Sequence, residues 1–297
     1  MSALTVLRFV VTHRANTGHR LQALWRLVRW QIASRLVNGD IVYAWVNGSK
    51  FLVRSGENGL TGNIYVGLQE FDDMAFVLHM LRPGDLFVDV GANVGSYSIL
   101  ACAVAGAHGC AVEPVPATFE RLVENMRINH LDEAVQCVNA GLGSEPGTLR
   151  FSSDMGVCNR ALASSDTRPG VVEVQGITLD ALLAGRSPRL IKIDVEGYES
   201  AVLAGADATL RDPYLQAVIM ELNGSGAQFG FDESKLFGLM VSHGFQPCAY
   251  VPAERRLVDA HGPGATASDN TIFVRDIDAV RNRLREAEAF DVNGKRF

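Results

Sequence analysis

Hydrophobic and polar positions alternate along most of the chain with the two periods that distinguish strands from helices. From residue 86 onwards, short apolar runs alternate with longer segments whose apolar residues recur every three or four positions. The predicted strands are 86–90, 110–113, 135–139, 190–195, 217–222, 245–250 and 271–274, and the predicted helices between them are 95–105, 116–129, 198–210 and 232–242. This alternation predicts an α/β fold with a doubly wound, mostly parallel sheet of seven strands.

The remaining segments predict an extension at each end of this core and one interruption within it. Residues 1–82 contain a helix over 21–36, a hairpin of strands 41–46 and 50–53 that turns at Asn47-Gly48, and a helix over 70–81. A polar stretch from Ser144 to Gly176 carries short strands at 148–151 and 171–174, and residues 155–160 within it are expected to form a flap over a substrate. Residues 276–297 are expected to form a charged terminal helix outside the main domain, which we place at 83–275.

Composition favours an enzyme with one sizeable core. The chain has 297 residues, of which 47% are hydrophobic and 20% charged. Its five cysteines form no C-x-x-C pair and its seven histidines no H-x-x-x-H pair, so reduced thiols and the absence of a zinc site are expected. Because no apolar run approaches 18 residues and residues 1–12 lack a signal-peptide pattern, a cytoplasmic protein is expected.

Basic charge is concentrated in the first fifty residues. They hold seven Lys or Arg and one acid, Asp40, a net charge of +6, so the other 247 residues carry −12. Apolar residues recur at helical spacing with arginines between them: Leu21, Leu24, Trp25, Val28, Ile32 and Leu36 alternate with Arg20, Arg26, Arg29 and Arg35. Two interpretations stay open. The helix packs on the main domain and helps to cover its cleft, or it contacts an inner membrane surface or an anionic lipid-linked or polymeric substrate.

The segment from Val88 to Tyr97, VDVGANVGSY, predicts a cofactor-binding loop between the first core strand and its helix. Gly91 and Gly95 lack a Cβ, so the backbone there can adopt a positive φ or approach a ligand closely. Unpaired N–H groups at the helix start would attract an anionic group of a ligand. The next strand ends in Glu113, whose carboxylate can accept hydrogen bonds from both hydroxyls of a ribose.

Glycine spacing argues against a nicotinamide dinucleotide as the cofactor. A G-x-G-x-x-G fingerprint that begins at Gly91 requires glycine at positions 93 and 96, where the chain has Asn93 and Ser96. An NAD-dependent oxidoreductase is therefore disfavoured. It remains an alternative, as does a non-catalytic protein of the same fold.

A second set of candidate residues lies at the end of the predicted strand 190–195. Period-two alternation places Lys192, Asp194 and Glu196 on one face of the strand, with successive side chains about 6 to 7 Å apart. Three charges on one face are costly to bury without partners. Either Lys192 and Asp194 form a buried pair and Glu196 caps the following helix, or the three side chains line a cleft at the carboxyl edge of the sheet.

Three segments in order resemble the FkbM family of class I methyltransferases that use S-adenosylmethionine. They are FVDVGANVGSYS (Phe87 to Ser98), EPVPATFERLVENMRIN (Glu113 to Asn129) and LIKIDVEGYESAVLAGA (Leu190 to Ala206). The resemblance covers roughly residues 80 to 222 and implies a Rossmann-like seven-stranded domain with a reversed hairpin at one edge. It also implies S-adenosylmethionine as cofactor and O-methylation of a hydroxyl on a sugar, a glycan or a secondary metabolite.

The resemblance assigns roles to individual residues. The expected cofactor site comprises Asp89, Gly91, Ala92, Asn93 and Gly95 around the methionine part, Glu113 on the ribose and Asn139 near the adenine. The chemistry of the reaction, rather than the resemblance, indicates the base, because a hydroxyl must be deprotonated to attack. Asp194 is the leading candidate, Glu196 is the alternate base or a positioning group, and Lys192 adjusts both. A divalent cation held by Asp194, Glu196 and Glu221 stays open. Because the main domain is acidic and lacks an Asn/Asp-Pro-Pro-Tyr/Phe motif, a nucleic-acid substrate is not expected.

Overall fold

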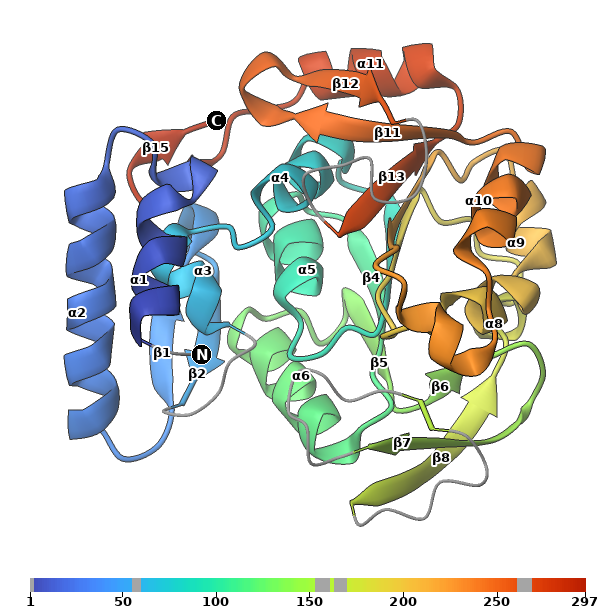
Figure 1. The fold of residues 1–297 in the computed structure, drawn as a ribbon, viewed down its shortest axis with the longest axis horizontal. Helices are drawn as coiled ribbons and strands as arrows, with labels where there is room; N and C mark the ends of the chain where they lie inside the picture. The colour runs from blue at the N-terminus through green and yellow to red at the C-terminus, as the bar shows by residue number, and fades with distance from the viewer. Residues whose placement is uncertain (1–2, 55–59, 153–160, 163–169, 261–268) are drawn as a thin grey trace.

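A large mixed sheet forms the centre of the molecule (Figure 1). The computed structural model describes residues 3–54, 60–152, 161–162, 170–260 and 269–297. The strand order is β12-β11-β13-β10-β9-β3-β4-β5, in which β10, β9, β3, β4 and β5 run parallel and β13, β11 and β12 run antiparallel at one edge. The strands are β3 (Leu86–Val90), β4 (His108–Val112), β5 (Val135–Val138), β9 (Leu190–Ile193), β10 (Ala217–Glu221), β11 (Gln246–Val251), β12 (Arg256–Asp259) and β13 (Asn270–Val274). The predicted doubly wound, mostly parallel fold is confirmed.

The predicted strand count of seven is wrong by one. All seven predicted strands are present, and β12 adds an eighth by antiparallel pairing with β11. The sequence of β12 is Arg-Leu-Val-Asp, which is too short to show the apolar alternation that marks a strand, and only Leu257 of it is buried. Pairing with a neighbour, rather than local pattern, makes this segment extended.

Helices cover both faces of the sheet, and successive strand residues point to opposite cores. In β3, for example, Phe87 belongs to one core and Val88 and Val90 to the other. The first core is completed by α4 (Phe71–Met80), α5 (Ser96–Ile99) with the π-helical turn Leu100–Val104, α6 (Pro116–Ile128) and α11 (Ile277–Arg285). The second is completed by α7 (Leu179–Leu183), α8 (Glu199–Ala204), α9 (Asp207–Arg211) and α10 (Glu233–Ser242).

The helix predicted over 198–210 is two helices, α8 and α9, separated at Gly205. A Cβ at Gly205 would lie 2.2 Å from the carbonyl oxygen of Gly143, so the backbone passes this point only because the side chain is absent. The Asp180 carboxylate then accepts hydrogen bonds from the N–H groups of Ala208 (2.9 Å) and Thr209 (2.8 Å) at the start of α9. A cap from a distant residue therefore begins a new helix.

The N-terminal extension lies along one side of the sheet domain (Figure 1). It contains α1 (Ala3–Thr12), α2 (Arg20–Leu36), the predicted hairpin of β1 (Ile41–Ala44) and β2 (Lys50–Val53), and α3 (Thr61–Val66). The hairpin turns where predicted, with positive φ at Asn47 (49°) and Gly48 (84°). The sequence prediction missed α1 and α3.

The interruption between β5 and β9 forms a small sheet of β6 (Gly141–Leu142), β7 (Gly147–Ser152) and β8 (Val171–Ile177). This confirms both short strands predicted there. The proposed flap, residues 155–160, lies outside the described residues. A terminal helix is present as α11, but it does not lie outside the main domain as expected, because Val280 and Leu284 are buried in the first core. The chain then ends in the strand pair β14 (Asp291–Val292) and β15 (Lys295–Arg296).

Asp85 connects three parts of the chain just before β3. Its buried carboxylate accepts a hydrogen bond from the N–H of Arg82 (2.8 Å) and forms ion pairs with Arg189 (3.2 Å), which precedes β9, and with Arg283 of α11. The amino ends of the two central strands are thereby fixed to the C-terminal helix.

We expect Asp85→Ala to lower the free energy of unfolding by about 3 kcal/mol, because it leaves two arginines without their shared carboxylate in a mostly buried position. Urea unfolding measures this loss. Asp132→Ala is the matched control, since it removes a carboxylate from an exposed pair with Arg127 at 3.7 Å and should change stability by about 0.5 kcal/mol or less. Equal effects of the two substitutions would contradict this role for Asp85.

Candidate active site

The glycine loop after β3 is pressed against the end of β9. Gly91 has a φ of 77°, and a Cβ there would lie 1.9 Å from the carbonyl oxygen of Asp194. Gly95 has a φ of 90° and precedes α5, where a Cβ would meet the side chains of Leu122 and Met126. Both glycines are therefore required by the local backbone and by close packing.

Every backbone N–H group from residue 91 to residue 95 already has a partner within the protein. The carbonyl oxygen of Val112 accepts from Gly91 (3.0 Å) and Ala92 (2.9 Å), and the Glu113 carboxylate accepts from Asn93 (3.0 Å). The N–H of Val94 donates to the Asn93 side chain, and that of Gly95 donates to Ala92. The end of β4 thus holds the loop in one shape.

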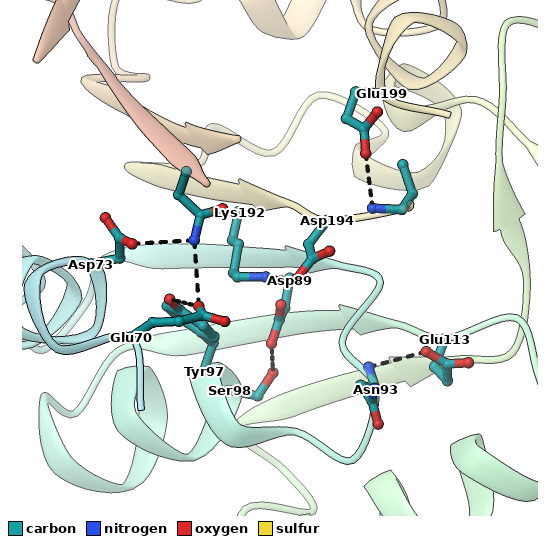
Figure 2. Close-up of polar contacts among 12 residues, drawn as sticks. Glu70, Asp73, Asp89, Asn93, Tyr97, Ser98, Glu113, Lys192, Asp194 and Glu199 are labelled. Atoms are coloured by element: carbon teal, nitrogen blue, oxygen red, sulfur yellow. Dashed lines mark hydrogen bonds and ion pairs between the residues drawn. The ribbon is translucent and has the colours of Figure 1, made fainter. Parts of the chain in front are cut away.

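Glu113 lies at the junction of the loop and β4 (Figure 2). Its buried carboxylate accepts hydrogen bonds from the N–H groups of Asn93 and Val115, each at 3.0 Å. Burial raises the pKa of Glu113 to about 7, although the two amides act in the opposite direction. Asn139 lies just beyond β5 and donates to the carbonyl oxygens of Glu113 (2.8 Å) and Pro114 (2.9 Å). The structure therefore brings the predicted cofactor residues of three adjacent strand ends together.

Asp89 differs from these residues because it lies within β3 rather than beyond a strand end, and it is only 1% exposed. Its carboxylate accepts a hydrogen bond from the Ser98 hydroxyl at 2.7 Å, which ties β3 to α5 (Figure 2). Burial raises its pKa, and Lys192 partly counters that effect. Asp89 pairs in register with Lys192 on the neighbouring strand β9.

Lys192 is a buried cation surrounded by acidic groups. Its Nζ lies 2.6 Å from Asp194 Oδ2 and 4.6 Å from the centroid of the Tyr97 ring (Figure 2). Burial alone would lower the pKa of Lys192, but the carboxylates of Asp194, Glu70 and Asp89 raise it above its ordinary value. The ammonium group is therefore charged and cannot act as a base.

Asp194 and Glu196 lie beyond β9, not within a strand that runs to residue 195 as predicted. The strand ends at Ile193, and Glu196 adopts a φ of 54°, the left-handed region that non-glycine residues rarely occupy. Glu199 stabilises this turn, because its carboxylate accepts hydrogen bonds from the backbone N–H groups of Val195 (3.2 Å) and Gly197 (3.1 Å). The predicted Lys192–Asp194 pair exists, but Glu196 does not cap the following helix α8, whose N-terminus has no side-chain cap.

The three carboxylates considered for a divalent cation do converge. Asp194, Glu196 and Glu221 each offer an oxygen within 4.8 Å of the others. Burial, followed by repulsion from Asp194 and Glu196, raises the pKa of Glu221 to about 9. Its Oε2 is buried without a hydrogen-bond partner among the described residues. A proton on Glu221 therefore relieves much of the repulsion in this cluster at neutral pH.

Among the residues of the site that were not predicted from the sequence, Tyr97, Glu70, Asp73 and Asn270 form one connected group. The hydroxyl of Tyr97 donates to Glu70, which lies just before α4 (Figure 2). The amide of Asn270, at the start of β13, donates to Asp73 (3.1 Å) and to Glu70 (3.4 Å). Tyr97 belongs to the loop motif identified from the sequence. No local sequence pattern marks Glu70, Asp73 and Asn270 as site residues, because about 200 residues separate Asn270 from the two carboxylates that it meets.

An open pocket of about 480 Å³ lies between these residues and the N-terminal extension. We call it the acidic pocket: six of its lining residues among those described are acidic and one is an arginine. They include Phe9, His13, Arg14, Glu70, Asp194 and Glu221. The wall on the N-terminal side comes from α1 and the turn after it. Of the two interpretations left open for the helix now seen as α2, covering the cleft does not apply to this pocket, because no residue of α2 is among the described residues that line it.

Comparison with known proteins gives a consistent family relationship. Residues 89–247, more than half of the chain, match the family model described as the methyltransferase FkbM domain. The hexuronic acid methyltransferase AglP of Haloferax volcanii is 29% identical over 157 residues, which cover 52% of this chain and 62% of AglP. The methyltransferase sdnD of Sordaria araneosa is 27% identical over 171 residues, covering 46% of this chain and 66% of sdnD. The similarity thus spans less than two thirds of either relative.

Among solved structures, the methyltransferase FkbM of Methylobacillus flagellatus KT is similar to this chain. The two are 14% identical with a TM-score of 0.44, over 72% of this chain and 52% of that one.

The pKa of Glu221 predicts how stability depends on pH. Its folded-state pKa of about 9 exceeds the ordinary value of 4.5, so the folded protein binds more protons between these pH values and loses stability as pH rises through that window. Glu221→Gln cannot ionise. We therefore expect the free energy of unfolding of the wild-type protein to fall relative to the variant from about pH 5 to about pH 9.

Urea unfolding of both proteins across this range measures the difference. Burial also raises the pKa of Glu113 and of Glu199 to about 7, and comparison with the variant cancels their contributions to the pH dependence. A constant difference would contradict a proton on Glu221. Repeating the series with magnesium chloride tests whether the three carboxylates bind a divalent cation. A bound cation would keep Glu221 ionised and so remove the pH dependence of stability that distinguishes the wild-type protein from the variant.

Proposed function

This chain belongs to the FkbM methyltransferase family, and we propose that it transfers a methyl group from S-adenosylmethionine to a hydroxyl of a sugar or another small acceptor. The observation that carries the proposal is the contact between two parts of the site. The glycine loop and Glu113 form a cofactor-type site, and Gly91 packs directly against the backbone of Asp194, which lines the acidic pocket. Donor and acceptor sites of this kind must be adjacent for direct transfer.

The residues present fit the proposed cofactor. Glu113 supplies a carboxylate at the carboxyl end of β4, where it can accept both ribose hydroxyls. Gly91, Ala92, Asn93 and Gly95 would surround the methionine part, and Asn139 would lie near the adenine. Asp89 is buried and bonded to Ser98, so we assign it to holding the loop rather than to contacting the ligand.

The acceptor requires a base, because a neutral hydroxyl is a poor nucleophile. When bound, the sulfonium cofactor supplies an activated methyl group. Lys192 pairs with Oδ2 of Asp194, whereas Oδ1 has no hydrogen-bond donor among the described residues and so could accept from the acceptor hydroxyl. The Asp194 side chain is 29% exposed and lines the acidic pocket. Since Glu221 retains a proton, we propose Asp194 as the base and Glu196 as its alternate. In this proposal Lys192 and the proton on Glu221 offset most of the negative charge of the cluster, and no divalent cation is required.

The charge of the acidic pocket favours one class of acceptor. Carboxylates accept hydrogen bonds from hydroxyls but repel other carboxylates. We therefore propose that the part of the acceptor that enters the pocket is a neutral polyol such as a sugar. An acceptor with its own carboxylate, as the name of AglP indicates for that relative, would have to place this group near Arg14.

We expect Glu113→Ala to weaken binding of S-adenosylmethionine about 10- to 100-fold, because a charge-assisted hydrogen bond contributes roughly 1.5 to 3 kcal/mol. Calorimetric titration with S-adenosylmethionine, S-adenosylhomocysteine and NAD measures it. Affinity of the wild-type protein should also rise as pH increases through about 7, where Glu113 ionises.

The matched control is Glu120→Ala, which removes an exposed carboxylate from α6. Unchanged affinity in Glu113→Ala would refute the ribose assignment. Tight binding of NAD alone would favour the oxidoreductase alternative.

For Asp194→Asn we expect the rate of methyl transfer to fall about 10²- to 10⁴-fold, the usual contribution of a general base, while affinity for the cofactor stays the same. Transfer of a labelled methyl group to a panel of sugars provides the assay. Asp207→Asn, at an exposed position on α9, is the control. If Asp194→Asn retains full activity while Glu196→Gln loses it, the base is Glu196.

A further inference from the structure

A row of large apolar side chains is exposed on the outer face of α2. Leu21, Trp25, Val28, Ile32 and Leu36 recur every three or four residues and so lie on one side of the helix. Their exposed fractions are 83%, 65%, 46%, 55% and 78%. We call these five residues the α2 stripe. In a soluble protein, a continuous apolar surface of this kind marks an interaction site.

The opposite face of α2 determines this orientation. Ala23 and Trp30 are buried against the rest of the N-terminal extension. Arg26 also points inward, where its guanidinium donates to the carbonyl oxygen of Tyr65 (3.1 Å) and to the side chain of Asn16 (2.9 Å). Because these contacts fix the rotation of the helix, the stripe is a stable surface feature. Figure 1 shows α2 at the outer edge of the molecule.

Positive charge borders the α2 stripe. Arg29 and Arg35 are exposed and, at about 100° of rotation per residue, lie on opposite borders of the stripe; Arg20 is exposed at the first turn of the helix. Residues 1–39 contain no Asp or Glu. An apolar row flanked by arginines is complementary to the interface of an anionic bilayer, where the arginine stems can extend along apolar surface and their guanidinium groups can reach lipid phosphates.

We propose that the α2 stripe docks the protein on the surface of an anionic membrane, with α2 lying in the plane of the interface. Contact would be peripheral, because no helix in the described part of the chain is long and apolar enough to cross a bilayer. A second copy of this chain is a poorer partner for the stripe. Two stripes packed face to face would bring the arginines of both copies to one seam without an acid to pair them.

The docking surface belongs to the same structural unit as the acidic pocket. Packing of α1 against α2 forms a helical hairpin, and α1 contributes Phe9 to the wall of the pocket. The membrane proposal stands independently of methyl transfer, since binding to vesicles is measured without acceptor or cofactor.

Vesicle co-sedimentation tests the proposal with the full chain. We expect binding to vesicles of phosphatidylglycerol and little binding to vesicles of phosphatidylcholine. The double variant Trp25→Glu, Ile32→Glu should bind at least about tenfold more weakly, since two apolar anchors become charged. Replacing Arg20, Arg29 and Arg35 by Gln should weaken binding about fivefold for each arginine. Val241→Glu, which changes a 49% exposed apolar residue on α10, is the matched control and should bind as the wild type does.

Fluorescence provides a second readout that does not depend on charged variants. Trp25 is exposed, whereas Trp30 is buried and Trp45 partly buried, so a blue shift on adding vesicles reports Trp25 entering the bilayer interface. Trp25→Phe keeps the stripe apolar and should bind vesicles without this shift.

Three results would overturn the proposal. One is the absence of binding to phosphatidylglycerol vesicles, and another is equal binding to both vesicle types. The third is a dimer in sedimentation velocity that dissociates in the Trp25→Glu, Ile32→Glu variant, which would assign the stripe to a second copy.

Discussion

The candidate active site depends on one buried ammonium group, the Nζ of Lys192. It lies among the carboxylates of Asp194, Asp89 and Glu70 and over the ring of Tyr97. Carboxylates this close to one another in a buried region would repel strongly without a shared cation. Lys192 therefore allows residues from β3, β9 and the start of α4 to approach the same point. Asp194, whose Oδ2 pairs with this ammonium, also lines the acidic pocket.

Close backbone packing complements this electrostatic arrangement. Gly91 lets the glycine loop after β3 touch the carbonyl group of Asp194, and Gly197 lets the turn after β9 pass within contact distance of Ser225. Any larger residue at position 91 would push the glycine loop away from Asp194, and any larger residue at position 197 would push the turn after β9 away from Ser225. The strained φ of Glu196 lies in the same turn and is held there by the Glu199 carboxylate. Strain of this kind persists where the surrounding structure determines it, and it is concentrated at functional sites.

The N-terminal extension has two faces with different roles. Its α1 helix closes one side of the acidic pocket, and the Arg14–Asp72 ion pair joins the turn after α1 to α4. Its α2 helix is held by Arg26 and Trp30, which leaves the apolar row exposed. The basic charge noted in the first fifty residues is thus divided between fixing the extension to the domain and bordering an outward surface.

The amino-acid sequence by itself determined the parallel core, because apolar periodicity is a local property of each strand and helix. Ile191 and Ile193 face one core as their alternation predicts, and the loop from Gly91 to Gly95 with Glu113 was identified from motif and spacing. Tertiary structure alone decided what depends on distant partners. Pairing with β11 creates β12, Asp180 begins α9, and Asn270 meets Glu70 across 200 residues. The helical period also located the apolar row of α2 correctly. Which face of the helix turns inward was decided by contacts with neighbouring elements, because Trp30 is buried there and Arg26 bonds to Asn16 and Tyr65. Periodicity describes one element, whereas burial and pairing are properties of the elements that surround it.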